Sequence, residues 1–218
     1  MKYSACVFDL DGTLLDTLED LKNSVNYTLK LKGYPQRTAE EVRSFVGNGI
    51  PMLIKRAVPE GTAETDFEEA LSVFKGHYAI HLNDNTAPYD GICEMLEYLK
   101  QNNIKTAVVT NKAHLAANDL IKHFFGDLIT VTVGQKDGVP TKPDPASLNS
   151  AMSVLNITKD EALFIGDSDV DVLTAHNGGL KCIGVTWGFR SKESLLSAGA
   201  DFIADTPKEI IRILDNNS

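Results

Sequence analysis

Three features are scarce in this chain of 218 residues, and each scarcity excludes a class of protein. The three cysteines form no CxxC pair, which argues against a disulfide framework and against zinc or redox chemistry. No apolar run approaches the ~18 residues of a transmembrane helix, and the N-terminal run meets Asp9 and Asp11 too early for a signal peptide. The net charge of −9 argues against broad binding to nucleic acid or anionic membranes. We therefore expect a soluble, cytoplasmic protein without a nucleic-acid or membrane partner, of unspecified oligomeric state.

Short apolar runs recur along the chain, and most of them are polar only at their ends. They are SACVFD (4–9), KTAVVT (105–110), LITVTV (128–133), ALFIGD (162–167), KCIGVT (181–186) and DFIAD (201–205). Such runs are typical of strands covered by helices on both faces, hence of a parallel sheet. Helical patterns fall between them, at 91–103, 114–125, 145–156, 171–178 and 192–199. This alternation predicts an α/β fold with a doubly wound, Rossmann-like core and right-handed crossovers.

Residues 16–81 interrupt the alternation because their pattern is helical throughout. Within them, Thr38 and Glu41 have the spacing of a capping box. We therefore expect an all-helical cap domain at 16–81, inserted into a catalytic core made of 1–15 and 82–218. Ligands of open α/β sheets bind at the carboxyl ends of the strands, so an insertion there would cover the site and set its specificity.

The first strand-like run leads directly into DLDGT (9–13). Residues i and i+2 of a strand point to the same side, so Asp9 and Asp11 face one way, while Gly12 permits an abrupt turn. Two neighbouring carboxylates at the end of a buried strand repel each other and are costly unless a cation neutralises them. An Asp-Gly turn is common, but the whole pentapeptide at the end of an apolar run indicates a functional site.

The run ALFI leads into GDSDVD (166–171) in the same way. Asp167 ends the strand, and Asp171 follows about one helical turn later, so its carboxylate can point back toward the same edge. The segment begins like an EF-hand loop but lacks the required glycine and glutamate further on, so we reject a calcium loop. Ser168 or Asp169 is expected to cap the following helix, which does not account for Asp167.

Two further segments have the opposite chemical character. Thr110 and Asn111 end the run KTAVVT, where a hydroxyl and backbone N–H groups can hold a phosphate. Lys142 lies in VPTKPDP, whose prolines stiffen the loop, and a rigidly held lysine suits a fixed anion. Taken alone, each segment is equally compatible with an ordinary strand end or surface loop. Combined with three acidic groups that suit Mg²⁺, they indicate phosphoryl transfer.

Four motifs, in this order, make the chain similar to the phosphatases of the haloacid dehalogenase superfamily, and most closely to their phosphoglycolate phosphatase-like branch. The motifs are DLDGT (9–13), Thr110-Asn111, Lys142 and GDSDVD (166–171). The resemblance spans essentially the whole chain, including a cap inserted after the first motif. The stretch 43–57 also resembles the glycine-rich cap loop of phosphoglycolate phosphatases, from which we expect Asn48 and Gly49 to contact the substrate.

The resemblance implies a role for each motif. Asp9 would be the nucleophile that forms an aspartyl-phosphate, and Asp11 would protonate the leaving oxygen and then activate water. Asp9, the backbone carbonyl of Asp11 and Asp167 would bind Mg²⁺, with Asp171 in support. The phosphate would be held by Thr110, Asn111 and Lys142.

We therefore predict a Mg²⁺-dependent phosphomonoester hydrolase that acts on a small phosphorylated metabolite, with 2-phosphoglycolate as the leading candidate. Inorganic pyrophosphatase and sugar-phosphate phosphatase or mutase remain alternatives within the same chemistry, because the sequence does not reveal the shape of the cap. A non-enzymatic phospho-aspartate receiver is an alternative of a different class. The cap and Asp11, which is placed to drive turnover, argue against it. Asp11 also disfavours carbon–halogen hydrolysis, because the dehalogenases of the superfamily have no aspartate there.

Overall fold

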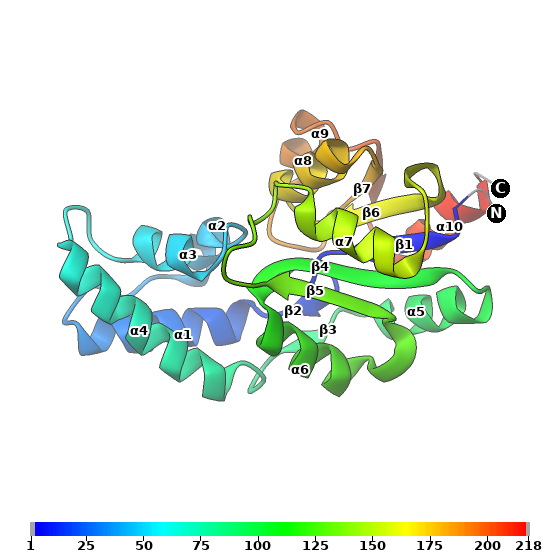
Figure 1. The fold of residues 1–218 in the computed structure, drawn as a ribbon. Coiled ribbons are helices and arrows are strands. Elements are labelled where there is room, and N and C mark those ends of the chain that lie inside the picture. The colour runs from blue at the N-terminus through cyan, green and yellow to red at the C-terminus, as the bar shows by residue number, and fades with distance from the viewer. Residues whose placement is uncertain (1–2, 217–218) are drawn as a thin grey trace. The chain divides into compact units, whose positions relative to one another are not determined.

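A six-stranded parallel sheet forms the centre of the computed structural model, which describes residues 3–216. In sheet order, the strands are β5 (Val131–Gln135), β4 (Lys105–Ala113), β1 (Ala5–Phe8), β6 (Ala162–Gly166), β7 (Lys181–Val185) and β8 (Phe202–Ala204) (Figure 1). Neighbouring strands are parallel throughout. The chain leaves β1 for β4 on one side and later returns to β6 on the other, so β1 lies at the switch point where such sheets bind ligands.

Helices cover both faces of this sheet, which explains why its central strands are apolar along their whole length. One face carries α7 (Ala146–Leu155), α8 (Asp169–Gly178) and α9 (Lys192–Ser197), whose side chains share a buried cluster with β1, β4, β6 and β7. The other carries α5 (Ile92–Gln101) and α6 (His114–Phe124), with α10 (Pro207–Asn216) packed beside α5. The predicted α/β fold with a Rossmann-like core is confirmed.

Two elements of the core differ from the sequence prediction. The strand predicted at 128–133 is β5 at Val131–Gln135, because a short 3-10 helix, Gly126–Leu128, begins at a glycine with φ of +54°. The second difference is α10, which the apolar runs did not indicate. Its buried side includes Ile210 and Leu214, and Ile211 and Ile213 beside them are half-buried.

Asp16–Ala87 forms a separate compact unit, here called the helical unit, and the rest of the chain forms the core unit. Its helices are α1 (Leu18–Leu31), α2 (Ala39–Phe45), α3 (Ile50–Ala57) and α4 (Glu64–His81). The capping box expected at Thr38 and Glu41 is present at the start of α2, where Thr38 Oγ1 accepts a hydrogen bond from the Glu41 backbone at 3.2 Å.

The helical unit continues past residue 81, where the sequence pattern placed its end. Asp20 in α1 accepts hydrogen bonds from Asn85 and Thr86, which ties the segment after α4 to the start of the unit. Two short strands, β2 (Leu15–Asp16) and β3 (Ala87–Pro88), pair where the chain passes from one unit to the other. Within residues 3–216, no helix is both long enough and apolar enough to cross a bilayer.

Candidate active site

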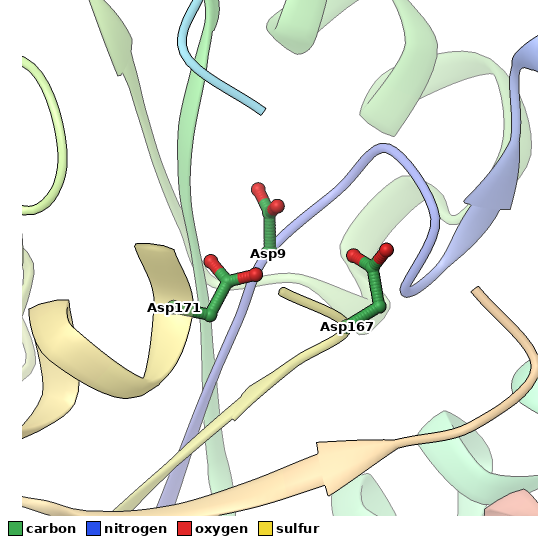
Figure 2. A group of neighbouring side chains, drawn as sticks. All are labelled: Asp9, Asp167 and Asp171. Atoms are coloured by element: carbon green, nitrogen blue, oxygen red, sulfur yellow. The ribbon is translucent and has the colours of Figure 1, made fainter. Parts of the chain in front are cut away.

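Three carboxylates meet at the carboxyl ends of the central strands. Asp9 directly follows β1, Asp167 directly follows β6, and Asp171 lies in the first turn of α8 (Figure 2). Each can offer one oxygen such that all three oxygens lie within 4.8 Å of one another. In Figure 2 the Asp171 side chain extends from its helix toward the base of the Asp9 side chain. Such a cluster of oxygen donors is the kind of ligand set that Mg²⁺ prefers.

The turn after Asp9 lets β1 and β6 place their aspartates this closely. Gly12 has a φ of +86°, which favours glycine, and its N–H donates to the Leu15 carbonyl at 2.9 Å. A Cβ at Gly12 would lie 2.5 Å from Asp167 Oδ2, so any other residue would displace the carboxylate. The next residue, Thr13, donates its hydroxyl to Asp167 Oδ1 at 3.0 Å. The DLDGT motif therefore both supplies Asp9 and holds Asp167.

A second support for Asp167 comes from the loop after β7, which the sequence reasoning missed. The Phe189 backbone N–H donates to Asp167 Oδ2 at 2.7 Å, and the backbone of Gly188 packs directly against this side chain. Trp187 donates its indole N–H to the Thr13 carbonyl at 3.0 Å. The available signal was a glycine between two aromatic residues at a strand's carboxyl end, which marks close backbone packing.

Asp171 uses its two oxygens for two different tasks. Its Oδ2 accepts hydrogen bonds from the backbone N–H and the hydroxyl of Ser168, at 3.1 and 2.6 Å, which caps α8. The prediction of a cap at Ser168 or Asp169 is thus confirmed for Ser168. The Oδ1 of Asp171 accepts a hydrogen bond from Lys142 Nζ at 2.7 Å. Asp171 therefore fixes both the start of α8 and the position of a lysine.

Lys142 lies between two of the carboxylates. Its Nζ is 2.8 Å from Asp9 Oδ1 and 2.7 Å from Asp171 Oδ1, and its side chain is only 2% exposed. Asn111 holds the main chain of Lys142 with both ends of its amide: Oδ1 accepts from the Lys142 N–H at 2.8 Å, and Nδ2 donates to the Lys142 carbonyl at 3.2 Å. The loop that was expected to present this lysine rigidly therefore does so with help from a second predicted residue.

Beyond Val109 the register between β4 and β5 shifts, and this irregular segment carries Thr110, Asn111 and Lys112. Thr110 is buried, and its Oγ1 accepts a hydrogen bond from the Lys112 backbone at 3.2 Å. Lys112 Nζ lies 2.9 Å from Asp11 Oδ1. The sequence reasoning gave Lys112 no role, although its place after Thr110 and Asn111 at the end of a central strand was a usable signal.

The charges of the site do not balance within the protein. Four aspartates of the two acidic motifs, Asp9, Asp11, Asp167 and Asp171, face two lysines, Lys112 and Lys142, which leaves a formal excess of two negative charges. Burial and then the charge of Asp171 raise the pKa of Asp9 to about 7, despite the attraction of Lys142. Burial and then the charges of Asp171 and Asp9 raise the pKa of Asp167 well above its usual range. A divalent cation would offset this excess.

Lys142 stays charged in these surroundings. Burial alone would lower the pKa of its ammonium group, but the attraction of Asp171 and Asp9 outweighs burial and raises it above the ordinary value. Asp9 Oδ1 is buried and pairs with Lys142, yet within residues 3–216 no donor reaches this oxygen with hydrogen-bond geometry. Its contact with Lys142 is therefore an ion pair whose geometry falls short of a well-aligned hydrogen bond.

The two residues expected to contact substrate, Asn48 and Gly49, lie in the helical unit, just before α3. Asn48 Oδ1 accepts a hydrogen bond from Arg56 Nη2 at 2.9 Å, and Arg56 Nη1 donates to the Phe45 carbonyl at 2.7 Å. Gly49 has a φ of +82° and is the N-cap of α3. Arg56 therefore holds the loop that carries both residues.

Comparison with known proteins agrees with the motifs. A model of the haloacid dehalogenase-like hydrolase family matches residues 6–185. The phosphoglycolate phosphatase of Vibrio parahaemolyticus is 34% identical over 214 residues, which cover 95% of this chain and 94% of that protein. Phosphoglycolate phosphatase 1 of Pseudomonas aeruginosa is 32% identical over 215 residues, which cover 96% of this chain and 79% of that protein.

A solved structure has the same fold over nearly the same length. The crystal structure of a predicted phosphoglycolate phosphatase from Haemophilus somnus matches with a TM-score of 0.91 at 30% sequence identity, over 98% of this chain and 99% of that one. The resemblance expected from the four motifs is therefore confirmed. The chain belongs to the haloacid dehalogenase-like hydrolase family, and it is a phosphatase of that family.

Proposed function

We propose that this phosphatase is a Mg²⁺-dependent phosphomonoester hydrolase that works through an aspartyl-phosphate on Asp9, with 2-phosphoglycolate as its substrate. The observation that carries the proposal is the convergence of Asp9, Asp167 and Asp171 within 4.8 Å, next to a buried lysine. The names of the relatives support the choice of substrate.

The residues present fit a magnesium ion. Their donors are all oxygens, the site carries two excess negative charges, and Asp9 Oδ1 has no well-aligned hydrogen-bond donor among the described residues. Asp9, the backbone carbonyl of Asp11 and Asp167 would hold the ion, with Asp171 in support. A bound Mg²⁺ supplies charge that offsets the repulsion between the carboxylates and the phosphate oxygens.

The proposed chemistry has two steps. In the first, a carboxylate oxygen of Asp9 forms a bond to phosphorus, the bond between phosphorus and the alcohol oxygen breaks, and Asp11 gives its proton to that oxygen. In the second, Asp11 takes a proton from water, whose oxygen attacks phosphorus and releases the Asp9 carboxylate and inorganic phosphate. With its pKa raised to about 7, about half of Asp9 is ionised at pH 7, so a cation beside it would increase the share of ionised nucleophile.

Thr110 and Lys142 would stabilise the transferring phosphoryl group, whose charge is spread over its equatorial oxygens. Lys142 is well suited because Asn111 and Asp171 fix its backbone and its ammonium group before the substrate arrives. Asn111 would therefore act mainly by holding Lys142. The helical unit, through Asn48 and Gly49, would select the alcohol part of the ester.

The proposal is tested by steady-state rates on 2-phosphoglycolate, sugar phosphates, pyrophosphate and 4-nitrophenyl phosphate, with Mg²⁺ and with EDTA. We expect many turnovers with Mg²⁺, none with EDTA, and the highest kcat/KM on 2-phosphoglycolate. Turnover that stops after one equivalent would favour a phospho-aspartate receiver. A clear preference for pyrophosphate or a sugar phosphate would replace the substrate but keep the mechanism.

The role of Asp9 is tested by Asp9→Asn, which keeps the shape of the side chain but removes the nucleophile. We expect a loss of activity of at least about 10⁴-fold with an unchanged circular dichroism spectrum. Asp90→Asn is the matched control, because Asp90 is an exposed aspartate of the same unit and should be replaceable without effect. A near-normal rate in Asp9→Asn would remove Asp9 as the nucleophile.

A further inference from the structure

Lys112 forms a largely buried pair with a carboxylate at the strand ends of the core unit, separate from the pairs made by Lys142. Its Nζ lies 2.9 Å from Asp11 Oδ1, its side chain is 3% exposed, and that of Asp11 is 15% exposed. Lys112 belongs to β4, which runs parallel to β1 as its direct neighbour, and Asp11 lies in the turn that follows β1, so the contact links the carboxyl ends of two adjacent strands. The pair spans 101 residues of sequence.

The main chain around Lys112 is held on two sides. Its N–H donates to Thr110 Oγ1 at 3.2 Å. On the other side, Gly134 of β5 approaches so closely that a Cβ there would lie 2.8 Å from the Lys112 carbonyl oxygen. Burying an ammonium group is costly unless it is paired, so a lysine fixed here needs a partner such as Asp11. Because the backbone of Lys112 is held in place, its ammonium group in turn restrains the Asp11 carboxylate.

We propose that Lys112 is a positioning residue for Asp11, which rests on the acid–base role of Asp11 in the proposed function. The ammonium group restrains the Asp11 carboxyl group by binding one of its oxygens. The other oxygen then stays where it passes its proton to the leaving alcohol oxygen as the bond to phosphorus breaks. The two lysines contact different carboxylates: Lys142 contacts Asp9 and Asp171, whereas Lys112 contacts Asp11.

The test uses the dependence of the reaction on the leaving group. An alkoxide must be protonated as it leaves, whereas 2,4-dinitrophenolate is stable without a proton, so a general acid matters only for the first. We expect Lys112→Met to lower kcat/KM for an alkyl phosphate by about 10- to 100-fold, a part of the roughly 10²- to 10⁴-fold that general acid catalysis contributes, and for 2,4-dinitrophenyl phosphate by less than about threefold. The ratio kcat/KM is used because it covers only the steps from free enzyme and substrate through the first phosphoryl transfer, and so leaves out hydrolysis of the aspartyl-phosphate.

A double-variant comparison separates a role through Asp11 from a direct one. If Lys112 acts through Asp11, then Lys112→Met combined with Asp11→Asn should be no slower than Asp11→Asn alone. Lys112→Arg should restore most of the activity on the alkyl ester. Lys105→Met is the matched control, since Lys105 lies at the opposite end of β4 and donates to the Leu155 carbonyl; it should change neither rate.

Two results would overturn the inference. An equal loss on both esters would mean that Lys112 acts on the phosphoryl group or on the fold, and so would additive losses in the double variant. The midpoint of thermal unfolding of Lys112→Met then distinguishes a direct effect on the phosphoryl group from a loss of stability. If instead Asp11→Asn itself loses equally on both esters, the proposed acid role of Asp11 fails, and that failure is visible without any Lys112 variant.

Discussion

Asp9 shares buried surroundings with two other carboxylates, those of Asp167 and Asp171, and with the single ammonium group of Lys142. An acid whose pKa is higher in the folded than in the unfolded protein holds its proton more tightly when folded. Its contribution to stability is therefore complete below the unfolded pKa and is lost as the pH rises through the folded pKa. For Asp9 this window runs from its ordinary value of 3.8 to about 7, and Asp167 shifts in the same direction.

The stability of the protein should therefore depend jointly on pH and Mg²⁺. We expect the midpoint of thermal unfolding in EDTA to fall between about pH 5 and pH 8, and Mg²⁺ to restore several degrees at pH 8 but much less at pH 5. The measurement is thermal unfolding with EDTA and with Mg²⁺ at both pH values. Asp9→Asn is the control, because it removes the titrating group. If the fall with pH were as steep in this variant, Asp9 would not be its cause.

Most of the candidate site was predictable because its acidic residues belong to short motifs at the ends of apolar strands. Asp9, Asp11 and Asp167 follow from local spacing and from the rule that such ends meet at one edge. The contacts of Lys112 and Phe189 were not predictable in the same way. Each depends on which strands are neighbours, and for Lys112 on an irregular register between β4 and β5. That register is set by tertiary packing, which the sequence pattern does not encode locally.

At the scale of elements, the segment after α4 is tied to α1 by one buried side chain. Asp20 accepts hydrogen bonds from the backbone N–H groups of Asn85 and Thr86, from Asn85 Nδ2 and from Thr86 Oγ1, all at 2.8 to 3.0 Å. Burial raises the pKa of Asp20, but the hydrogen bonds from Asn85 and Thr86 outweigh it and hold the pKa below the ordinary value. Its stabilising effect is therefore complete above the unfolded pKa and is lost as the pH falls through the folded pKa.

Removing this carboxylate should destabilise the helical unit. We expect Asp20→Ala to lower the free energy of unfolding by about 3 kcal/mol at neutral pH, because it leaves the donors of buried Thr86 and of Asn85 without their charged acceptor. The loss should shrink at a pH below the folded pKa of Asp20, where the wild type has also lost the charge. Urea denaturation at both pH values measures it. Glu19→Ala is the matched control: Glu19 is exposed and pairs only at the surface with Lys22, so its removal should cost less than about 1 kcal/mol. Equal losses in both variants would contradict the assignment.

The elements that the sequence predicted well have strong periodic patterns, whereas β5 was misplaced and α10 was missed for different reasons. The four helices of the helical unit and the strands β1, β6 and β7 follow from apolar runs or a helical period. Leu128 and Ile129 begin the apolar run that was predicted as a strand, but they lie in and just after a 3-10 helix. Ile129 is buried there without strand pairing. The apolar residues of α10, at 210, 211, 213 and 214, do recur at helical spacing, so this helix was readable from the sequence. Burial alone therefore does not distinguish a strand from a turn that points into the core.

At the scale of the whole molecule, the residues proposed for chemistry and those proposed for substrate selection belong to two units of different architecture. The acidic cluster, Lys112 and Lys142 all lie in the core unit, whereas Asn48, Gly49 and Arg56 lie in the helical unit. If the helical unit selects the substrate, changes within it should alter discrimination between esters, while changes in the core unit should lower all rates together. Variants of the helical unit should therefore change the relative rates on different esters, whereas variants of the core unit should lower the rates on all esters by a similar factor.

Asn48 is the residue with which to test this division. We expect Asn48→Ala to raise KM for 2-phosphoglycolate by about tenfold while changing kcat/KM for 4-nitrophenyl phosphate by less than about twofold, because a lost substrate contact affects only the ester that makes it. Asn23→Ala, at an exposed asparagine of α1, should leave both of these kinetic constants unchanged.

Arg56→Ala distinguishes a direct substrate contact of Asn48 from support of its loop, since Arg56 bonds to Asn48 Oδ1 and to the Phe45 carbonyl. If Arg56→Ala raised KM as much as Asn48→Ala did, the shape of the loop would matter, and not the amide itself. Full activity of Asn48→Ala on 2-phosphoglycolate would exclude this side chain from substrate recognition.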